Sequence, residues 1–238
     1  MPPPKPFSIA IIGGGISGLV LAIALHRRQI PVTIYEQAGR FGEIGAGVGF
    51  GPNAVQAMRI CDKSIEEAFL TISTHNQWPS KKHVWFDFLD GRDVDSGETG
   101  HQDAVFQIPT TRGQHAGCHR AHFLDQMVKL VPEDIAKFGK RLKDISENQN
   151  SGKMIMKFHD GTAAEADAVI GCDGIKSRMR QILVGDGHLS ANPVCTHKYA
   201  YRGLIPMKTA VEALGEERAQ NACLHVCPGS LPIPPEEF

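Results

Sequence analysis

Hydrophobic residues near the start of the chain are interrupted by glycines in a pattern that predicts a strand, a turn, a helix and a second strand. Residues 7–12 form a short apolar run ending at glycines, which is typical of a buried parallel strand. Residues 17–28 are mostly apolar before turning polar, which predicts a largely buried helix. Residues 31–35 are rich in β-formers and predict a second strand closed by Glu36. The sequence therefore predicts a right-handed βαβ unit.

The later hydrophobic pattern predicts shorter elements. Helices are expected over 52–60, 119–131, 177–183 and 209–220, and strands over 84–89, 153–158, 164–172 and 198–205. The glycine-dense segment 42–51 is expected to be a loop, and residues 159–162 a turn between two strands. The proline-rich residues 228–238 fit no regular element.

Composition narrows the function classes. The 238 residues carry a net charge of −1 without a Lys/Arg run, which disfavours a nucleic-acid surface. No window suggests a signal peptide or a membrane span. The cysteines follow no framework spacing, so reduced thiols in a cytosolic protein are expected. They are Cys61, Cys118, Cys172, Cys195, Cys223 and Cys227.

The first glycines form a nucleotide-binding motif, Gly13-x-Gly15-x-x-Gly18, between the predicted strand and helix. Gly13 allows the tight turn, Gly15 lets a diphosphate approach the backbone, and Gly18 lets the helix pack closely on the strand. Free N–H groups and a partial positive charge at the helix start then attract the diphosphate.

Glu36 completes this motif, because an acidic residue is expected about 20 residues further on, at the end of the second strand. Its carboxylate accepts hydrogen bonds from ribose hydroxyls and repels a 2′-phosphate, which disfavours NADP at this position. The motif by itself leaves FAD and NAD open.

Further motifs give the chain a resemblance to the single-component FAD-dependent aromatic monooxygenases, in particular the salicylate hydroxylase-like branch. They are Tyr35-Glu36, the segment 41–54, His119-Arg120-Ala121 and Asp173-Gly174-x-x-Ser177-x-x-Arg180. The resemblance implies an α/β fold, with a Rossmann-like FAD-binding domain on a parallel sheet and part of a smaller β-rich substrate domain. Residues 1–70 and 119–183 would bind FAD, 71–118 and 184–227 would belong to the substrate domain, and 228–238 would form a tail.

The resemblance also implies roles for particular residues. Glu36 would hold the adenosine ribose, and Arg120 would contact FAD from its helix. Ala46, Gly47 and Gly49 would lie in a loop near the flavin, and Asp173 and Gly174 in a motif tied to both FAD and NAD(P)H. Alternatives stay open: Arg120 as a surface arginine, the glycines as plain loop, and Asp173 and Ser177 as a turn and a helix cap.

Arg202 is the candidate for the catalytic site. The resemblance places a Tyr-Arg-Gly strand in the substrate pocket, where the arginine would hold a phenolate or carboxylate, a task that suits its forked donors. The alternative is an arginine on the wet face of a strand. The implied reaction uses NAD(P)H to reduce FAD and O₂ to hydroxylate a phenolic or other aromatic small molecule.

No metal site is expected. His115, His119 and His122 lie near Cys118, and Cys223 lies four residues before Cys227, but neither arrangement has a zinc-site spacing.

The chain departs from the family pattern in one respect. The resemblance implies a later Gly-Asp-Ala-Ala-His type of segment that binds the ribityl chain, and no such segment occurs in this sequence. We therefore expect a chain shortened at its C-terminal end, with weak FAD affinity. A non-catalytic nucleotide-binding remnant and a simple NAD-dependent dehydrogenase are the competing interpretations; the second leaves segment 42–54 unexplained.

Overall fold

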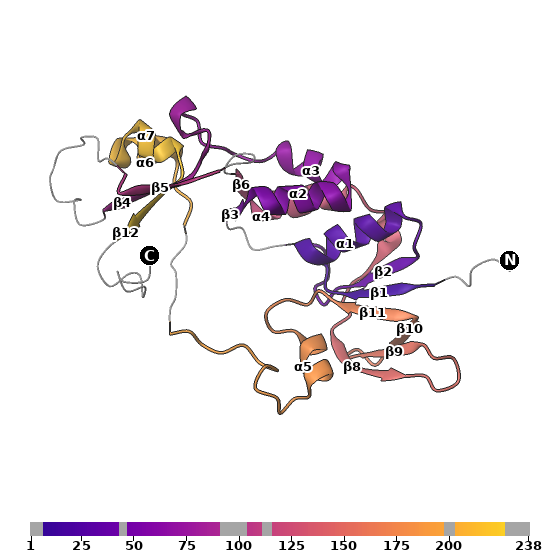
Figure 1. The fold of residues 1–238 in the computed structure, drawn as a ribbon. Helices are drawn as coiled ribbons and strands as arrows, with labels where there is room; N and C mark the ends of the chain where they lie inside the picture. The colour runs from indigo at the N-terminus through magenta and orange to yellow at the C-terminus, as the bar shows by residue number, and fades with distance from the viewer. Residues whose placement is uncertain (1–6, 43–46, 91–103, 111–115, 198–202, 227–238) are drawn as a thin grey trace. The chain divides into compact units, whose positions relative to one another are not determined.

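The computed structural model describes residues 7–42, 47–90, 104–110, 116–197 and 203–226 (Figure 1). The chain divides into two compact units, and each unit is built from separate stretches of sequence. Unit 1 draws on Met1–Ala46, Gln56–Ile72 and His119–Tyr201, whereas unit 2 draws on Gly47–Val55, Ser73–Cys118 and Arg202–Phe238.

Unit 1 is built on a parallel sheet with the strand order β11-β1-β2-β7. The strands are β1 (Ile9–Ile12), β2 (Val32–Tyr35), β7 (Ala136–Lys137) and β11 (Ala168–Gly171). Ile12 is paired with both Tyr35 and Gly171, so the carboxyl ends of β1, β2 and β11 lie at one edge. Helix α1 (Ile16–Arg27) joins β1 to β2, which confirms the predicted βαβ unit.

Helices cover one face of this sheet (Figure 1). Helix α1 packs on α4 (Arg120–Val128), and α4 packs on α3 (Lys63–Leu70), where the rings of Phe69 and Phe123 meet edge-on at 5.4 Å. Helix α2 (Pro52–Cys61) precedes α3. The core on this side contains fully buried aliphatic residues that alternate along the strands and recur on α1: Ile11, Ile34, Leu19, Ala22 and Ile23.

An antiparallel meander covers the other face. Its strands are β8 (Leu142–Glu147), β9 (Met154–Phe158) and β10 (Ala163–Ala166), in the order β10-β9-β8. Ala10 and Ile12 of β1 join Met156 and Phe158 of β9 in one buried cluster. The cluster also includes Met179 of α5 (Arg178–Val184), so helix α5 belongs to the same core.

Unit 2 contains a three-stranded sheet with the order β12-β4-β5. Strand β4 (Val84–Asp90) pairs in parallel with β12 (Cys223–Val226) and antiparallel with β5 (Phe106–Pro109). Strands β3 (Gly47–Phe50) and β6 (Ala116–His119) form a second small sheet. Unit 2 also contains the short helix η1 (Pro79–Lys81) and helices α6 (Met207–Leu214) and α7 (Glu216–Gln220), whereas η3 (Glu133–Ile135) belongs to unit 1. Within the described part of the chain, no helix has the length and apolar character needed to cross a bilayer.

Four secondary-structure predictions need correction. Residues 164–172 form two strands in different sheets, because Asp167 turns aside to accept hydrogen bonds from Ser8. Residues 209–220 form two helices separated at Gly215, whose φ is +79°. Segment 42–51 is not all loop, since it contains β3. For the predicted strand 198–205, residues 198–202 lie outside the described residues, and 203–205 are not in a strand.

The fold class is confirmed: unit 1 is an α/β domain with a parallel sheet, and antiparallel and mixed sheets accompany it.

Candidate cofactor site

The turn between β1 and α1 is tight enough to require glycine at two positions. Gly13 has φ +103°, and a Cβ there would lie 2.7 Å from the carbonyl carbon of Cys172. A Cβ on Gly18 would collide with the carbonyl oxygen of Gly13. Alanine would therefore strain the turn at Gly13 and push α1 away from it at Gly18.

The start of α1 presents free backbone donors beside this turn. Gly15 is the N-cap residue and supplies no side-chain cap, and the first turn of α1 contains no acidic residue. The first N–H groups of the helix therefore keep both their hydrogen-bonding capacity and the positive end of the helix dipole. Gly13, Gly14 and Gly15 all line a pocket of about 800 Å³ in unit 1, an arrangement that suits a diphosphate.

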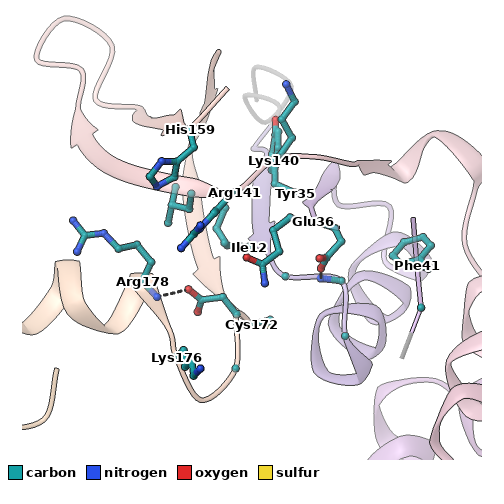
Figure 2. Close-up of a pocket in the computed structure, with 18 of the residues that line it drawn as sticks. Ile12, Tyr35, Glu36, Phe41, Lys140, Arg141, His159, Cys172, Lys176 and Arg178 are labelled. Atoms are coloured by element: carbon teal, nitrogen blue, oxygen red, sulfur yellow. Dashed lines mark hydrogen bonds between the residues drawn. The ribbon is translucent and has the colours of Figure 1, made fainter. Parts of the chain in front are cut away.

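Glu36 lies directly beside the glycine turn. Its Oε2 accepts a hydrogen bond from the Gly14 amide at 2.6 Å (Figure 2). Its Oε1 accepts one from the Ala38 amide at 2.7 Å. An ionised carboxylate has about four acceptor positions, so each oxygen can accept a further hydrogen bond. The carboxylate is thus fixed in place while keeping acceptor capacity for ribose hydroxyls.

The loop after β11 forms the facing wall of the pocket. Asp173 uses both carboxylate oxygens within the chain: Oδ1 accepts from the Ser177 hydroxyl at 2.6 Å, and Oδ2 accepts from the amides of Arg178 at 2.7 Å and Met179 at 3.0 Å. Ser177 in turn caps α5 by accepting from the Arg180 amide at 2.9 Å. Asp173 therefore holds the loop on the start of α5, and Gly174, with φ +77°, turns the chain along the pocket wall.

Arg180 connects this loop to a second one. Its guanidinium donates to the carbonyl of Ile175 at 2.6 Å and to that of Ala191 at 3.2 Å. Gln181 also holds the second loop, by donating to Asn192 at 2.8 Å. Asn192 lines the pocket, whereas Arg180 is not among the lining residues. The arginine therefore acts on the pocket by positioning its walls.

Cationic side chains outnumber acidic ones around the pocket. Against Glu36 and Asp173, the lining includes six such residues: Arg40, Arg120, Lys140, Arg141, Lys176 and Arg178. Such a lining favours a polyanionic ligand. Only Arg120 among the six was a candidate from the sequence. The other five come from separate segments, and the weak signals present, such as the Lys140-Arg141 pair after Gly139, did not distinguish them from surface charges.

Cys172 lies in the pocket lining but is not a candidate nucleophile. Burial, with a contribution from the neighbouring Asp173 carboxylate, raises the pKa of its thiol. The thiol is therefore protonated at neutral pH, whereas thiolates are the reactive form.

The remaining predicted residues lie elsewhere. Gly47 and Gly49 are exposed on β3 of unit 2 and do not line this pocket. Ala46 and Arg202 lie outside the described residues. The rings of His119 and His122 are 4.5 Å apart. Across the ranges that the structure describes, no group of three potential metal-ligating residues occurs; His115 and Cys227 fall outside those ranges.

Comparison with known proteins identifies relatives of the whole chain. The NAD(P)-binding Rossmann-like domain family matches residues 11–47, which include the glycine turn and Glu36. An FAD-dependent monooxygenase of Monascus ruber is 44% identical over 218 residues, covering 92% of this chain and 49% of that protein. The 6-methylsalicylate 1-monooxygenase of Aspergillus terreus is 48% identical over 214 residues, covering 88% of this chain and 46% of that protein.

A solved structure gives the same result. A salicylate hydroxylase in a substrate complex is 32% identical, with a TM-score of 0.70, over 93% of this chain and 50% of that one. The resemblance to salicylate hydroxylase-like FAD-dependent monooxygenases is thereby confirmed. The chain spans about half the length of the curated relatives it matches.

Proposed function

We propose that this chain, a relative of the salicylate hydroxylase-like FAD-dependent monooxygenases, binds FAD in unit 1 and hydroxylates a phenolic or other aromatic small molecule with NAD(P)H and O₂. The observation that carries the proposal is the unit 1 pocket. It combines an uncapped helix start, a fixed carboxylate and a cationic lining at the carboxyl ends of parallel strands, where nucleotides bind in such sheets.

The residues fit the adenosine diphosphate part of FAD. The amides at the start of α1 would bind the diphosphate, and the free acceptor positions of Glu36 would bind the ribose hydroxyls. Asp173 would act through the chain by holding the loop that carries Gly174 against the cofactor. Arg120, exposed at the start of α4 and part of the pocket lining, would add a positive charge beside the diphosphate. When bound, the flavin supplies hydride acceptance and the activation of O₂.

The substrate class follows from the relatives. Their names refer to 6-methylsalicylate and salicylate, both aromatic rings with a hydroxyl and a carboxylate. We propose that Arg202 pairs with such an anion, because a guanidinium binds a carboxylate with two parallel hydrogen bonds. Gly47, Gly49 and Ala46 are proposed to approach the flavin side of the cofactor, and NAD(P)H is proposed as the reductant.

Binding and turnover can be tested on the same sample. The purified chain is titrated with FAD and the change in the flavin absorbance spectrum is recorded without desalting, because the expected affinity is weak; NADH and NADPH oxidation are then followed in excess FAD with and without salicylate, under ¹⁸O₂. We expect a saturable change in the flavin spectrum, oxidation that the aromatic compound stimulates, and one ¹⁸O atom in the product. NAD(P)H oxidation at the same rate with and without the aromatic compound, with no ¹⁸O in that compound, would contradict the monooxygenase assignment.

A second candidate function is nucleotide binding without turnover. It is favoured by the described pocket, whose glycine turn, carboxylate and cations provide for an adenosine diphosphate. FAD uptake with no substrate-stimulated oxidation would support this alternative.

A further inference from the structure

The pocket extends beyond Glu36 to a wall formed where β8 begins. The backbone holds this wall in place: the Lys140 amide donates to the Glu36 carbonyl at 2.8 Å, and the His159 amide donates to the Arg141 carbonyl at 2.9 Å. Lys140, Arg141 and His159 all line the pocket. In Figure 2, Arg141 lies between Glu36 on one side and His159 and Arg178 on the other. This wall is therefore tied directly to the residue proposed to bind ribose.

The direction of the nucleotide follows from its covalent structure, if FAD binds as proposed above. The diphosphate is attached to the 5′ carbon of the ribose and adenine to the 1′ carbon, so the two groups leave the sugar in different directions. With the diphosphate at the start of α1 and the hydroxyls at Glu36, adenine extends away from the glycine turn. The pocket wall that remains on that side contains Arg141 and His159.

The cationic side chains in and beside this wall differ in whether other residues already hold them by hydrogen bonds. Lys140 Nζ donates to Asp160 at 2.6 Å and to Thr162 at 2.9 Å. Arg178 donates from Nε to the Lys143 carbonyl at 2.9 Å and from Nη1 to Asp186 at 2.7 Å. The Arg141 side chain is exposed, and no hydrogen bond or ion pair from the described residues engages its guanidinium.

We propose that Arg141 recognises the adenine base of the cofactor by stacking its guanidinium plane on the ring. A guanidinium is planar, weakly hydrated and suited to stacking on aromatic faces, whereas an ammonium lacks the plane. The partners of Lys140 and Arg178 hold those two cations in the pocket wall, whereas the Arg141 guanidinium has no such partner among the described residues and can move onto the base. The proposal deepens the FAD function and adds a residue that determines preference for the base.

The test uses ADP as the probe, measured by isothermal titration calorimetry on the full chain. We expect Arg141→Ala to weaken ADP binding about tenfold, in line with the loss of one stacking contact. Arg141→Lys keeps the charge and loses the plane, so it should be nearly as weak. Lys143→Ala is the matched control, because it removes an exposed cation two residues further along that does not line the pocket; its ADP affinity should equal that of the wild type.

Inorganic pyrophosphate separates stacking from charge. We expect Arg141→Ala to bind pyrophosphate as the wild type does. Equal weakening of ADP and pyrophosphate, or full recovery in Arg141→Lys, would assign Arg141 to the phosphates and overturn the proposal. Unchanged ADP binding in Arg141→Ala would overturn the stacking role of Arg141 and leave the FAD function standing. No ADP binding by the wild type would overturn both.

Discussion

Gly13 and Gly39 have different surroundings, although Gly13 lines the nucleotide pocket and Gly39 directly precedes a residue that does. Gly13 combines a positive φ with the backbone of Cys172 at the position of a Cβ, whereas Gly39 has ordinary φ and open space around it. The first therefore requires glycine to let β1 pass beside the loop that follows β11, and the second does not.

We predict that Gly13→Ala lowers the free energy of unfolding by about 1–3 kcal/mol, because the new side chain meets both backbone strain and a clash. Gly39→Ala should change it by less than about 1 kcal/mol. Urea denaturation followed by far-UV circular dichroism measures both free energies. Tryptophan fluorescence is unsuitable, because both tryptophans, Trp78 and Trp85, lie in unit 2, whereas the two glycines lie in unit 1. Equal stability of the two variants would contradict this account of the turn.

Single residues differ in how well the sequence revealed them. Gly13, Gly15, Gly18 and Glu36 stand at fixed offsets within one βαβ unit, so their order along the chain was enough to find them. Lys140, Arg141 and Lys176 meet at the pocket only because β8 and the loop before α5 converge there. The sequence contains no periodic signal for such a convergence.

Helix α3 depends on a side-chain cap at its start. Asp62 is the N-cap residue and accepts from the Ser64 amide at 2.9 Å and from the Ser64 hydroxyl. The cap orients a helix whose Ile65 and Phe69 are fully buried. Helix α3 was not among the predicted elements, although Asp62 before an apolar pair at i, i+4 is a usable signal.

Asp62 also makes the stability of α3 depend on pH. The hydrogen bond from the Ser64 side chain, followed by weaker contributions from the Ser64 amide and nearby arginines, lowers the pKa of Asp62. A lowered pKa in the folded state means that the stabilisation is present above the unfolded pKa, about 3.9, and is lost as the pH falls through the folded value.

We therefore predict that Asp62→Ala lowers the free energy of unfolding by about 1 kcal/mol at pH 7, and that its difference from the wild type shrinks below pH 4. Urea denaturation between pH 7 and pH 3 measures this dependence. Glu67→Ala, which removes an exposed ion pair with Lys63, is the control and should cost less than about 0.5 kcal/mol. A difference for Asp62→Ala that is constant across the pH range would contradict the cap assignment.

Element boundaries were harder to predict than element types. The run 164–172 looked like one strand because its apolar residues are nearly continuous, yet the bonds from Ser8 to Asp167 separate β10 from β11. Likewise, the helical pattern of 209–220 conceals Gly215, whose positive φ ends α6. In both cases one residue overrides the surrounding pattern, through a long-range contact at Asp167 and through backbone freedom at Gly215.

At the scale of the whole molecule, the described nucleotide pocket belongs to unit 1 alone. Every residue that lines it comes from that unit, in seven separate parts of the chain. The order of motifs predicted the Rossmann-type unit. An interleaved substrate domain was expected only from the family resemblance, because the hydrophobic pattern gives no signal for the pairing of distant segments such as β4 and β12.

We predict that ADP protects backbone amides from hydrogen exchange in unit 1 segments 12–15, 35–42, 140–142 and 172–178, because a bound ligand reduces local opening. Peptides from β4 and β12 of unit 2 should exchange at unchanged rates. Hydrogen-exchange mass spectrometry with and without ADP measures both sets. Protection concentrated in unit 2 would contradict the assignment of the pocket.

The central claim is that FAD binds in unit 1 with its ribose on Glu36, and FAD titration of the wild type and of Glu36→Gln by calorimetry tests it most directly. The neutral amide keeps the size of the side chain but replaces one acceptor oxygen by a donor. Loss of a charge-assisted hydrogen bond of about 1.5–3 kcal/mol predicts an affinity at least tenfold lower. Equal affinities, or no FAD binding by the wild type, would contradict the claim.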